Sequence, residues 1–406
     1  MLRNSCVHSL LDTDFYKFTM LQAYLHQTPD MLSEWTLHCR NDEDLTPYLD
    51  QVHAALEAIG RLTLTDDEAV RLQQLFPDFK PDFIDYLRHF RYDPSLLKIG
   101  VQRGQLTLRA QGPLRQVSML EIPVLATVSE IRNRIRYPEV TPQVVEQVTL
   151  ARIDALRQMA TPEELAGFRF ADFGTRRRFS LAAQRQVLVL LQKHLPQQLS
   201  GTSNPMLAAE LGLPVVGTMA HEWLQTFQAI SPLADSQRAA LRHWLDEYPV
   251  KARIALTDII GIDAFCRDLD VELAEQYSGF RQDSGDPVAW GEKLLARLAA
   301  LGIDGRDKVL VFSDGLDLPR SLALYRHFRG RAQCSFGIGT SLMGDFGLNR
   351  PMNIVMKMVT LNQRPVAKIS DSPGKSLCRD VRFLNHLMDT FAVNDEVRRQ
   401  VMHSLV

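Results

Sequence analysis

The sequence has few cysteines, no long hydrophobic run and almost no net charge. Its five cysteines include no Cys-x-x-Cys pair and no histidine at zinc-ligand spacing, which predicts a reduced, intracellular protein without a structural zinc site. No stretch reaches about 18 apolar residues and the N-terminus lacks a signal-peptide core, so we expect no membrane span and a cytoplasmic location. With 46 basic against 48 acidic side chains, the chain has no long-range field for a polyanion, which argues against nucleic acid as a partner.

Several common catalytic motifs are also absent. The loop over 337–345 is neither a Gly-Lys-Ser/Thr phosphate loop nor a dinucleotide-binding glycine fingerprint, and the sequence has no Gly-x-Ser-x-Gly elbow and no His-Glu-x-x-His helix. What remains is ordinary globular composition over 406 residues, 45% hydrophobic and 23% charged, without internal repeats or low-complexity tracts. Such a chain can form two or three domains with a substantial core.

Residues 1–135 predict a mixed α+β domain. Apolar residues recur at helical spacing, behind Asp and Thr residues that could cap the first segment, and predict helices over 12–25, 48–62 and 66–76. Short β-like runs separated by Gly and Pro predict strands over 97–101, 105–108 and 114–119.

From about residue 165 to residue 340, short apolar runs alternate with helix-like stretches. This alternation predicts a parallel α/β sheet, either open or closed into a barrel. In both forms ligands bind at the carboxyl ends of the strands, which is where loops rich in Gly, Ser, Thr and Asp fall. The seven runs end within 168–177, 198–204, 213–221, 252–261, 278–286, 308–317 and 332–340.

Residues 353–370 are typical of a β-hairpin with a turn around Asn362 to Pro365. Such a hairpin could return to the sheet of the first domain and make that domain discontinuous. We therefore expect an α+β domain over 1–135 joined by about 350–375, an α/β unit carrying the site over 136–349, and a helical segment over 376–406.

Two glycine-containing loops could bind a phosphorylated sugar. In the loop from Ser313 to Asp317, Asp314 can accept both hydroxyls of a ribose, and Gly315 lets backbone N–H groups approach an anion. The loop over 337–345 places glycines and Thr340 where free N–H groups at a helix start can cradle phosphate. Each loop could instead be a plain turn between a strand and a helix.

Charged side chains crowd the loop over 281–287. Arg281 can hold phosphate through two parallel hydrogen bonds, and Asp283 and Asp286 suit Mg²⁺ held mainly through water. The alternative is a turn that caps the following helix.

Two further loops offer an aromatic ring, arginines and a histidine. Phe173 could stack on a flat heteroaromatic ring and Arg176 could meet a phosphate or carboxylate, although a core ring and solvated arginines would give the same pattern. His221 follows a buried-type strand at a predicted helix start. It could be a general acid or base, a nucleophile that accepts a phosphoryl group, or a capping residue.

Taken together, these loops resemble the nicotinate phosphoribosyltransferase family. The resemblance covers essentially the whole chain and rests on motifs in the family's order: DTDFYKFTM, DFGTRR, GTSN, GTMAHEW, RQDSGDP, SDGLD and FGIGT. It implies a type II phosphoribosyltransferase fold, an irregular TIM-like α/β barrel over 136–349 beside the α+β domain. It also implies a homodimer with active sites shared across the interface.

The activity that the resemblance implies is the first step of NAD salvage from nicotinate. Nicotinate, 5-phosphoribosyl 1-diphosphate, ATP and water would give nicotinate mononucleotide, diphosphate, ADP and phosphate, with Mg²⁺ on the diphosphate. Cleavage at ribose C1 creates oxocarbenium character, so the site must neutralise the leaving group and place the ring nitrogen in line. His221 matches the family's transiently phosphorylated histidine, through which ATP hydrolysis would switch the enzyme to a tight-binding state.

The resemblance also implies roles for individual residues. Phe173 would stack on the nicotinate ring, and Tyr16 would close the other face from the partner subunit. The catalytic residues would be His221, Asp314 and Arg281. Mg-diphosphate would be positioned by Asp258 and Asp283. The other expected substrate contacts are Gly174, Thr175, Arg176, Thr202, Ser203, Ser313, Gly315, Gly337, Gly339 and Thr340.

Ser203 bears on the choice between nicotinate and nicotinamide. The related nicotinamide enzymes carry an acidic residue at this position, and a carboxylate there would repel the carboxylate of nicotinate. In this chain Thr202, Ser203 and their backbone N–H groups can only help an anion, and Ile254 replaces a serine of the nicotinamide enzymes. The sequence therefore favours nicotinate.

Other functions stay open at this point. Nicotinamide or quinolinate phosphoribosyltransferases are the neighbouring activities, although quinolinate requires more positive charge. An aldolase or oxidoreductase on an α/β barrel would be supported by a Schiff-base lysine, for which Lys308 and Lys368 are the candidates. A non-catalytic nucleotide-binding regulator would share most of the motifs. The sequence also leaves open whether Arg177 or Arg178 enters the site.

Overall fold

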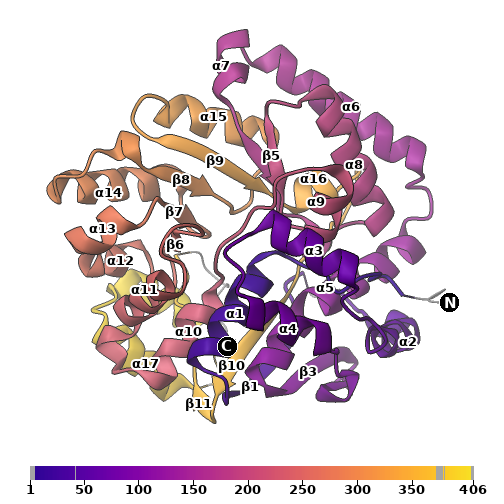
Figure 1. The fold of residues 1–406 in the computed structure, drawn as a ribbon, viewed down its shortest axis with the longest axis horizontal. Helices are drawn as coiled ribbons and strands as arrows, with labels where there is room; N and C mark the ends of the chain where they lie inside the picture. The colour runs from indigo at the N-terminus through magenta and orange to yellow at the C-terminus, as the bar shows by residue number, and fades with distance from the viewer. Residues whose placement is uncertain (1–4, 42, 372–377, 379, 404–406) are drawn as a thin grey trace.

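The computed structural model describes residues 5–41, 43–371, 378 and 380–403 (Figure 1). Its strands are β1 (Leu32–Cys39), β2 (Leu97–Gln102), β3 (Gln105–Pro113), β4 (Phe170–Asp172), β5 (Leu199–Thr202), β6 (Ile254–Leu256), β7 (Gly279–Gln282), β8 (Val309–Phe312), β9 (Gln333–Ile338), β10 (Ile354–Leu361) and β11 (Arg364–Pro365).

The α-helices are α1 (Tyr16–Gln27), α2 (Leu49–Ile59), α3 (Asp66–Leu75), α4 (Pro81–His89), α5 (Leu114–Arg136), α6 (Pro142–Met159), α7 (Pro162–Gly167), α8 (Leu181–His194), α9 (Pro205–Leu211), α10 (His221–Ile230), α11 (Ser236–Glu247), α12 (Ile262–Asp268), α13 (Val271–Gln276), α14 (Pro287–Ala300), α15 (Leu318–Phe328), α16 (Thr340–Met343), α17 (Val381–Thr390) and α18 (Asp395–His403). Short 3₁₀ turns are η1 (Thr46–Tyr48), η2 (Pro94–Leu96), η3 (Thr175–Arg177), η4 (Leu233–Asp235) and η5 (Gly305–Asp307). Among the described residues, no helix combines the length and the apolar character that a membrane span requires.

The smaller sheet is antiparallel and combines strands from the N-terminal and C-terminal parts of the chain. Its order is β11-β10-β1-β3-β2, so the predicted hairpin does return to the N-terminal sheet. The turn between β10 and β11 places Asn362 and Gln363 at φ 47° and 62°, the left-handed geometry that matches the twist of a hairpin. The register sets Lys357 opposite Thr36. The expected domain boundaries stay predictions, and parts of the 350–375 and 376–406 segments lie outside the described residues.

The larger sheet is parallel and forms the predicted irregular α/β barrel. Its order is β5-β4-β9-β8-β7-β6, with helices packed around it (Figure 1). The third predicted run, which ends within 213–221, does not form a full strand. It makes one parallel bridge to β5, between Thr202 and Val215, and Thr218 Oγ1 donates to Ile254 O of β6 at 3.0 Å. This extended segment therefore lies between the two ends of the sheet.

Gly201 allows the segment around Pro214 to lie close to β5. A Cβ atom on Gly201, whose φ is +153°, would lie 2.3 Å from the carbonyl oxygen of Pro214. Pro214 itself has no N–H to donate, and Gly217 at φ +136° turns the chain away from extended pairing. A full ladder is therefore impossible here, which explains why the predicted strand is reduced to a bridge.

Two sequence predictions in the first domain need correction. The run at 114–119 belongs to α5, because apolar side chains such as Leu114, Val117 and Leu120 continue at helical spacing well beyond that short window. The first helix begins at Tyr16 rather than near Asp12 and receives no side-chain cap. Its expected caps are used elsewhere, since Asp12 pairs with Arg178 at 2.6 Å.

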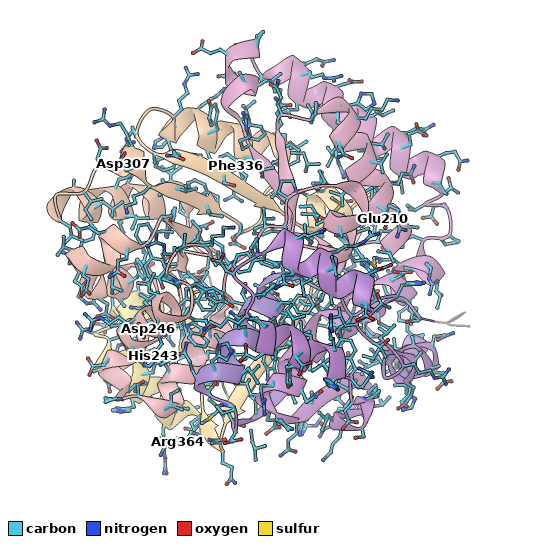
Figure 2. The ribbon with its side chains drawn as sticks, viewed as in Figure 1. Glu210, His243, Asp246, Asp307, Phe336 and Arg364 are labelled. Carbon is cyan, nitrogen blue, oxygen red and sulfur yellow. The ribbon has the colours of Figure 1, made fainter. Side chains whose placement is uncertain are left out.

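A stack of phenylalanine rings fills the barrel. Phe336 on β9 stacks on Phe312 of β8 and on Phe168, with ring centroids 5.6 and 5.4 Å apart. Figure 2 shows Phe336 among the barrel strands, whereas Arg364 lies at the lower edge of the molecule. This apolar filling leaves the carboxyl ends of the strands to build a polar pocket.

Candidate active site

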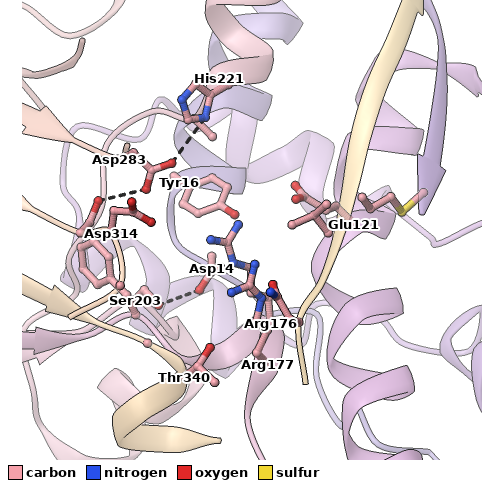
Figure 3. A pocket seen from close by; sticks show the side chains of 18 of the residues that line it. Asp14, Tyr16, Glu121, Arg176, Arg177, Ser203, His221, Asp283, Asp314 and Thr340 are labelled. Carbon is pink, nitrogen blue, oxygen red and sulfur yellow. Dashed lines mark hydrogen bonds and ion pairs between the residues drawn. The ribbon is translucent and has the colours of Figure 1, made fainter. Parts of the chain in front are cut away.

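A pocket of about 610 Å³ opens between the barrel loops and the antiparallel sheet. Twelve of the residues predicted for the site line it: Tyr16, Phe173, Arg176, Ser203, His221, Arg281, Asp283, Ser313, Asp314, Gly315, Gly339 and Thr340. The other five, Gly174, Thr175, Thr202, Asp258 and Gly337, do not form its wall. Figure 3 shows Tyr16, Arg176, His221 and Asp283 around the same space.

His221 is the first residue of α10 and is held in one orientation. Its Nε2 lies 2.8 Å from Asp258 Oδ1, and its Nδ1 lies 3.8 Å from Asp283 Oδ2. Burial and the positive charge of Lys368 lower the pKa of His221 to about 4, although Asp258 opposes the shift. At neutral pH the ring is therefore uncharged. Because the Asp258 carboxylate is an acceptor, Nε2 carries the proton and Nδ1 keeps its lone pair.

Asp258 lies behind His221, and both of its carboxylate oxygens accept hydrogen bonds. It is fully buried and accepts from His221, from Lys368 Nζ at 2.6 Å and from Ser284 Oγ at 2.6 Å. Burial would raise the pKa of Asp258, but Lys368 and His221 outweigh it and hold the pKa well below its usual range. The expected part of Asp258 in positioning Mg-diphosphate through water stays a prediction.

Asp283 is the carboxylate that fits Mg²⁺. One oxygen atom of Asp283, one of Asp258 and one ring nitrogen of His221 lie within 4.8 Å of one another, but Asp283 alone of the three is partly exposed in the pocket. Ser313 Oγ donates to Asp283 Oδ1 at 3.1 Å. Burial raises the pKa of Asp283, yet Lys368 outweighs burial and lowers it to about 2, so this carboxylate is ionised and can accept a cation.

The aromatic pair forms within one chain. Phe173 lies against Gly337 of β9, where an added Cβ would meet the ring at 2.4 Å, so Gly337 makes room for Phe173 rather than binding a ligand itself. Tyr16 lines the pocket from the N-terminus of α1 of the same chain. Tyr16 and Phe173 of one chain thus line the same pocket, and the expectation that Tyr16 comes from the partner subunit stays a prediction.

Three predicted substrate contacts belong to a buried network around Asp172. Gly174 N donates to Asp172 Oδ1 at 2.7 Å, and Thr202 Oγ1 donates to Oδ2 at 2.7 Å. Thr175 Oγ1 accepts from Gln184 Nε2, which also reaches Asp172. Because a buried carboxylate must be hydrogen-bonded, these groups hold the loop in shape and are not available to a ligand.

The Ser203 hydroxyl is also hydrogen-bonded, to an aspartate that the sequence did not indicate. Its Oγ donates to Asp14 Oδ1 at 2.6 Å, and both residues line the pocket. Burial raises the pKa of Asp14 to about 6, although Ser203 and Arg176 work against the shift. The interpretation that this corner can only help an anion is therefore wrong, because an acidic group stands beside Ser203.

Three further cations line the pocket: Arg40 and Lys357 were not predicted from the sequence, and Lys368 was considered only as a Schiff-base lysine. Arg40 enters from the end of β1, Lys357 from β10 and Lys368 from the segment that follows β11. No local motif marks them, because only the return of β10 to β1 brings them to the barrel. Burial, Lys368 and other nearby cations lower the pKa of Lys357 to about 7.

The three consecutive arginines have different places. Arg176 and Arg177 line the pocket, whereas Arg178 is fully buried and pairs with Asp12. Burial and the neighbouring guanidinium groups of Arg176 and Arg40 lower the pKa of Arg177 to about 9. Together the cations can hold several phosphate or carboxylate groups.

The comparisons with known proteins agree with this geometry. The model of the nicotinate phosphoribosyltransferase (NAPRTase) family matches residues 168–395, and the model of that family's N-terminal domain matches residues 11–129. Proteins named nicotinate phosphoribosyltransferase from Ectopseudomonas mendocina and Edwardsiella ictaluri are 49% and 48% identical, each over 95% of this chain and over 97% and 96% of their own lengths.

Solved structures show the same fold. The crystal structure of nicotinate phosphoribosyltransferase from Vibrio cholerae superposes with a TM-score of 0.93 at 38% identity and covers 98% of this chain and 97% of its own. That from Porphyromonas gingivalis gives a TM-score of 0.89 at 34% identity over 95% of this chain and 100% of its own. The pocket, the matching family models and these relatives together show that the chain belongs to the nicotinate phosphoribosyltransferase family.

Proposed function

We propose that this enzyme transfers the phosphoribosyl group of 5-phosphoribosyl 1-diphosphate to nicotinate and couples the transfer to ATP hydrolysis. The observation that carries the proposal is one pocket that combines two aromatic walls, a group of cations and an uncharged histidine. The ring nitrogen of nicotinate attacks ribose C1 as the bond from C1 to diphosphate breaks. The products are nicotinate mononucleotide and diphosphate.

Each part of the pocket has a task in that reaction. Phe173 and Tyr16 hold the flat ring, and Asp314 accepts hydrogen bonds from the ribose hydroxyls. Arg176, Arg281 and the backbone at 339–340 neutralise the phosphate groups. Asp283 would hold Mg²⁺, which would supply positive charge beside the leaving diphosphate.

His221 is suited to carry a phosphoryl group. Its Nδ1 attacks the γ-phosphorus of ATP, the bond to the bridging oxygen breaks and ADP leaves; water later cleaves the phosphorus–nitrogen bond and releases phosphate. Asp258 accepts from Nε2–H at 2.8 Å and so stabilises the ring as positive charge develops. The free energy of ATP hydrolysis can thereby favour a substrate-binding state of the pocket.

Nicotinate rather than nicotinamide or quinolinate fits the charge of the pocket. Arg40, Arg176, Arg177 and Lys357 supply positive charge for a carboxylate in addition to the phosphates. Neither lysine proposed for a Schiff base supports an aldolase, since Lys368 pairs with Asp258 and Lys308 Nζ donates to the carbonyl oxygen of Tyr277 at 2.8 Å. The relatives' printed names favour the same substrate.

A mass-spectrometric assay tests the proposal. Purified protein is incubated with 5-phosphoribosyl 1-diphosphate, Mg²⁺ and either nicotinate or nicotinamide, with and without ATP. Nicotinate mononucleotide formed together with stoichiometric ADP is the expected result. Product from nicotinamide alone would contradict the assigned substrate, and no product from either base would favour the non-catalytic regulator.

The pKa of Lys357 predicts how diphosphate binding depends on pH. With a pKa of about 7, Lys357 is charged below pH 7 in the ligand-free protein and loses its charge above it. We therefore expect the affinity for diphosphate to fall by up to about tenfold per pH unit above 7, beyond the change due to the ionisation of diphosphate itself. Titration calorimetry between pH 6 and pH 8.5 measures this fall. Lys357→Met should lack the extra component, and an identical pH dependence in both proteins would refute the prediction.

Gly337 provides a test of the aromatic wall. In Gly337→Ala the new Cβ would lie 2.4 Å from the Phe173 ring, so the ring must move, and we expect the KM for nicotinate to rise on the order of tenfold with a smaller change in kcat. Gly100→Ala is the matched control, because an added Cβ there meets nothing closer than 4.0 Å. Equal KM values for both variants would remove the support for Phe173 as a ring contact.

The oligomeric state and location are finer points of the proposal. Phe173, Tyr16, the cations and His221 of one chain line the same pocket, so we propose a homodimer in which each subunit supplies these groups to its own pocket. A cytoplasmic location, predicted from the sequence, suits a reaction whose substrates are nicotinate, ATP and a phosphorylated sugar.

A further inference from the structure

A buried ion cluster beside the pocket has no part in the mechanism above. Lys17 is fully buried, and its Nζ lies 2.6 Å from Glu121 Oε2 and 2.5 Å from Glu222 Oε2. The same ammonium group lies 5.0 Å from the ring centroid of Trp35. Buried ion pairs contribute little net stability, because desolvation offsets their attraction, so the cluster calls for another explanation.

The cluster joins the neighbours of two pocket residues. Lys17 directly follows Tyr16 at the start of α1, and Glu222 directly follows His221 at the start of α10. The Lys17–Glu222 ion pair therefore fixes the distance between the two helix starts that present Tyr16 and His221 to the pocket. Glu121 connects the same ammonium group to α5.

Glu222 is held firmly by other donors as well. Ser118 Oγ donates to Glu222 Oε1 at 2.5 Å, and Tyr24 OH donates to the same oxygen at 3.4 Å. With Lys17 on the second oxygen, three donors from α1 and α5 converge on this carboxylate. Because three donors fix the Glu222 carboxylate, a small displacement of the α10 start is passed on to α1 and α5.

The start of α1 contacts the other pocket loops too. Phe15 N donates to the carbonyl oxygen of Ser203 at 2.6 Å, and Thr19 Oγ1 donates to the carbonyl oxygen of Thr218. Thus α1 is tied to the loop that bears Ser203 and to the loop that ends at His221. Lys17 supplies the one charged connection between α1 and α10 among these contacts.

We infer that Lys17 is a positioning residue that couples the orientation of Tyr16 to the position of His221. The inference rests on the proposed function, in which Tyr16 holds the nicotinate ring and His221 carries the phosphoryl group. A shift of the α10 start at His221 moves Glu222, and the ion pair transmits that shift to Lys17 and Tyr16. Lys17 itself touches neither ligand, since it is absent from the pocket wall.

A double-mutant cycle tests this coupling. Equilibrium binding of nicotinate is measured for the unmodified protein, Lys17→Met, Tyr16→Ala and the double variant. We expect Lys17→Met alone to weaken binding on the order of tenfold, but to add less than about twofold in the Tyr16→Ala background, because it acts through Tyr16. Equal effects of Lys17→Met in both backgrounds would overturn the inference.

Two further variants separate positioning from general destabilisation. Lys17→Arg keeps the charge and should restore most of the affinity. Glu247→Gln is the matched control: Glu247 is buried and accepts from Gln22 Nε2 at 2.8 Å, so it contacts α1 away from Tyr16. It should lower the unfolding temperature without changing nicotinate binding, and a loss of affinity like that of Lys17→Met would contradict a specific role for Lys17.

Glu222→Gln covers the case in which Lys17→Met does not fold. It leaves Lys17 paired with Glu121 and should show the same non-additivity with Tyr16→Ala. Turnover by the unmodified protein tests the proposed function separately. Absent nicotinate binding and turnover would overturn that function and the inference with it, whereas normal turnover with additive effects would overturn the inference alone.

Discussion

Replacing His221 by asparagine is expected to abolish the stimulation by ATP while some ATP-independent transfer remains. The variant lacks the Nδ1 nucleophile but keeps the aromatic and cationic walls that bind nicotinate and 5-phosphoribosyl 1-diphosphate. A coupling between two sites typically changes affinity about 5- to 150-fold. We expect ATP to raise kcat/KM of the unmodified protein by a factor in this range and to leave kcat/KM of His221→Asn unchanged. Transfer is measured with and without ATP, and phosphate on the protein is followed with γ-labelled ATP.

His243→Asn is the control for that experiment. His243 lies on α11 with its side chain about half exposed, and we expect its variant to retain the ATP effect. The role of His221 would be contradicted if His221→Asn lost both activities while keeping its fold, because the residue would then be needed for transfer itself. Phosphate incorporated by His221→Asn at the normal rate would contradict the phosphohistidine.

Asp258→Asn should produce the second large effect, on the phosphorylation step. An asparagine at this site can present an N–H group to His221 Nε2, which favours the other tautomer and leaves no lone pair on Nδ1. It also leaves the buried Lys368 without its closest carboxylate. We expect the rate of phosphorylation to fall on the order of 10³-fold and the free energy of unfolding to fall by roughly 3 kcal/mol.

Ser284→Ala separates these two consequences. It removes one donor to Asp258 but leaves His221 and Lys368 in place, so we expect a loss of stability near 1 kcal/mol and less than about a tenfold change in phosphorylation. Rapid-quench measurement of labelled protein gives the rate, and chemical denaturation gives the stability. An Asp258→Asn variant that is phosphorylated as fast as the unmodified protein would rule out the orienting role.

The residues that could be predicted from the sequence lie at the carboxyl ends of the short apolar runs of the α/β unit. Phe173, His221, Arg281, Asp283 and Asp314 each lie at the carboxyl end of such a run, where the parallel topology itself brings them together. Their place depends on local pattern and on one general rule about parallel sheets. The resemblance to a family then gave each of them a chemical task.

Residues that depend on tertiary pairing could not be predicted. Arg40 and Lys357 reach the pocket only because β1 and β10 pair across most of the chain. The environment of Ser203 was misjudged for the same reason, since Asp14 comes from a segment far away in sequence. Thr202 shows a further limit: pattern alone does not say whether a side chain at a strand end faces a ligand or a buried carboxylate such as Asp172.

The pairing of β1 with β10 also has a consequence for synthesis of the chain. At about 5–20 residues per second, the ribosome needs roughly 15–60 s to proceed from the end of β1 at Cys39 to the start of β10 at Ile354. During that time one edge of β1 has no native partner and offers unpaired backbone groups to other chains. The nascent enzyme is therefore most exposed to aggregation just before its last strands emerge, and conditions that slow translation of the barrel should lower the yield of folded protein.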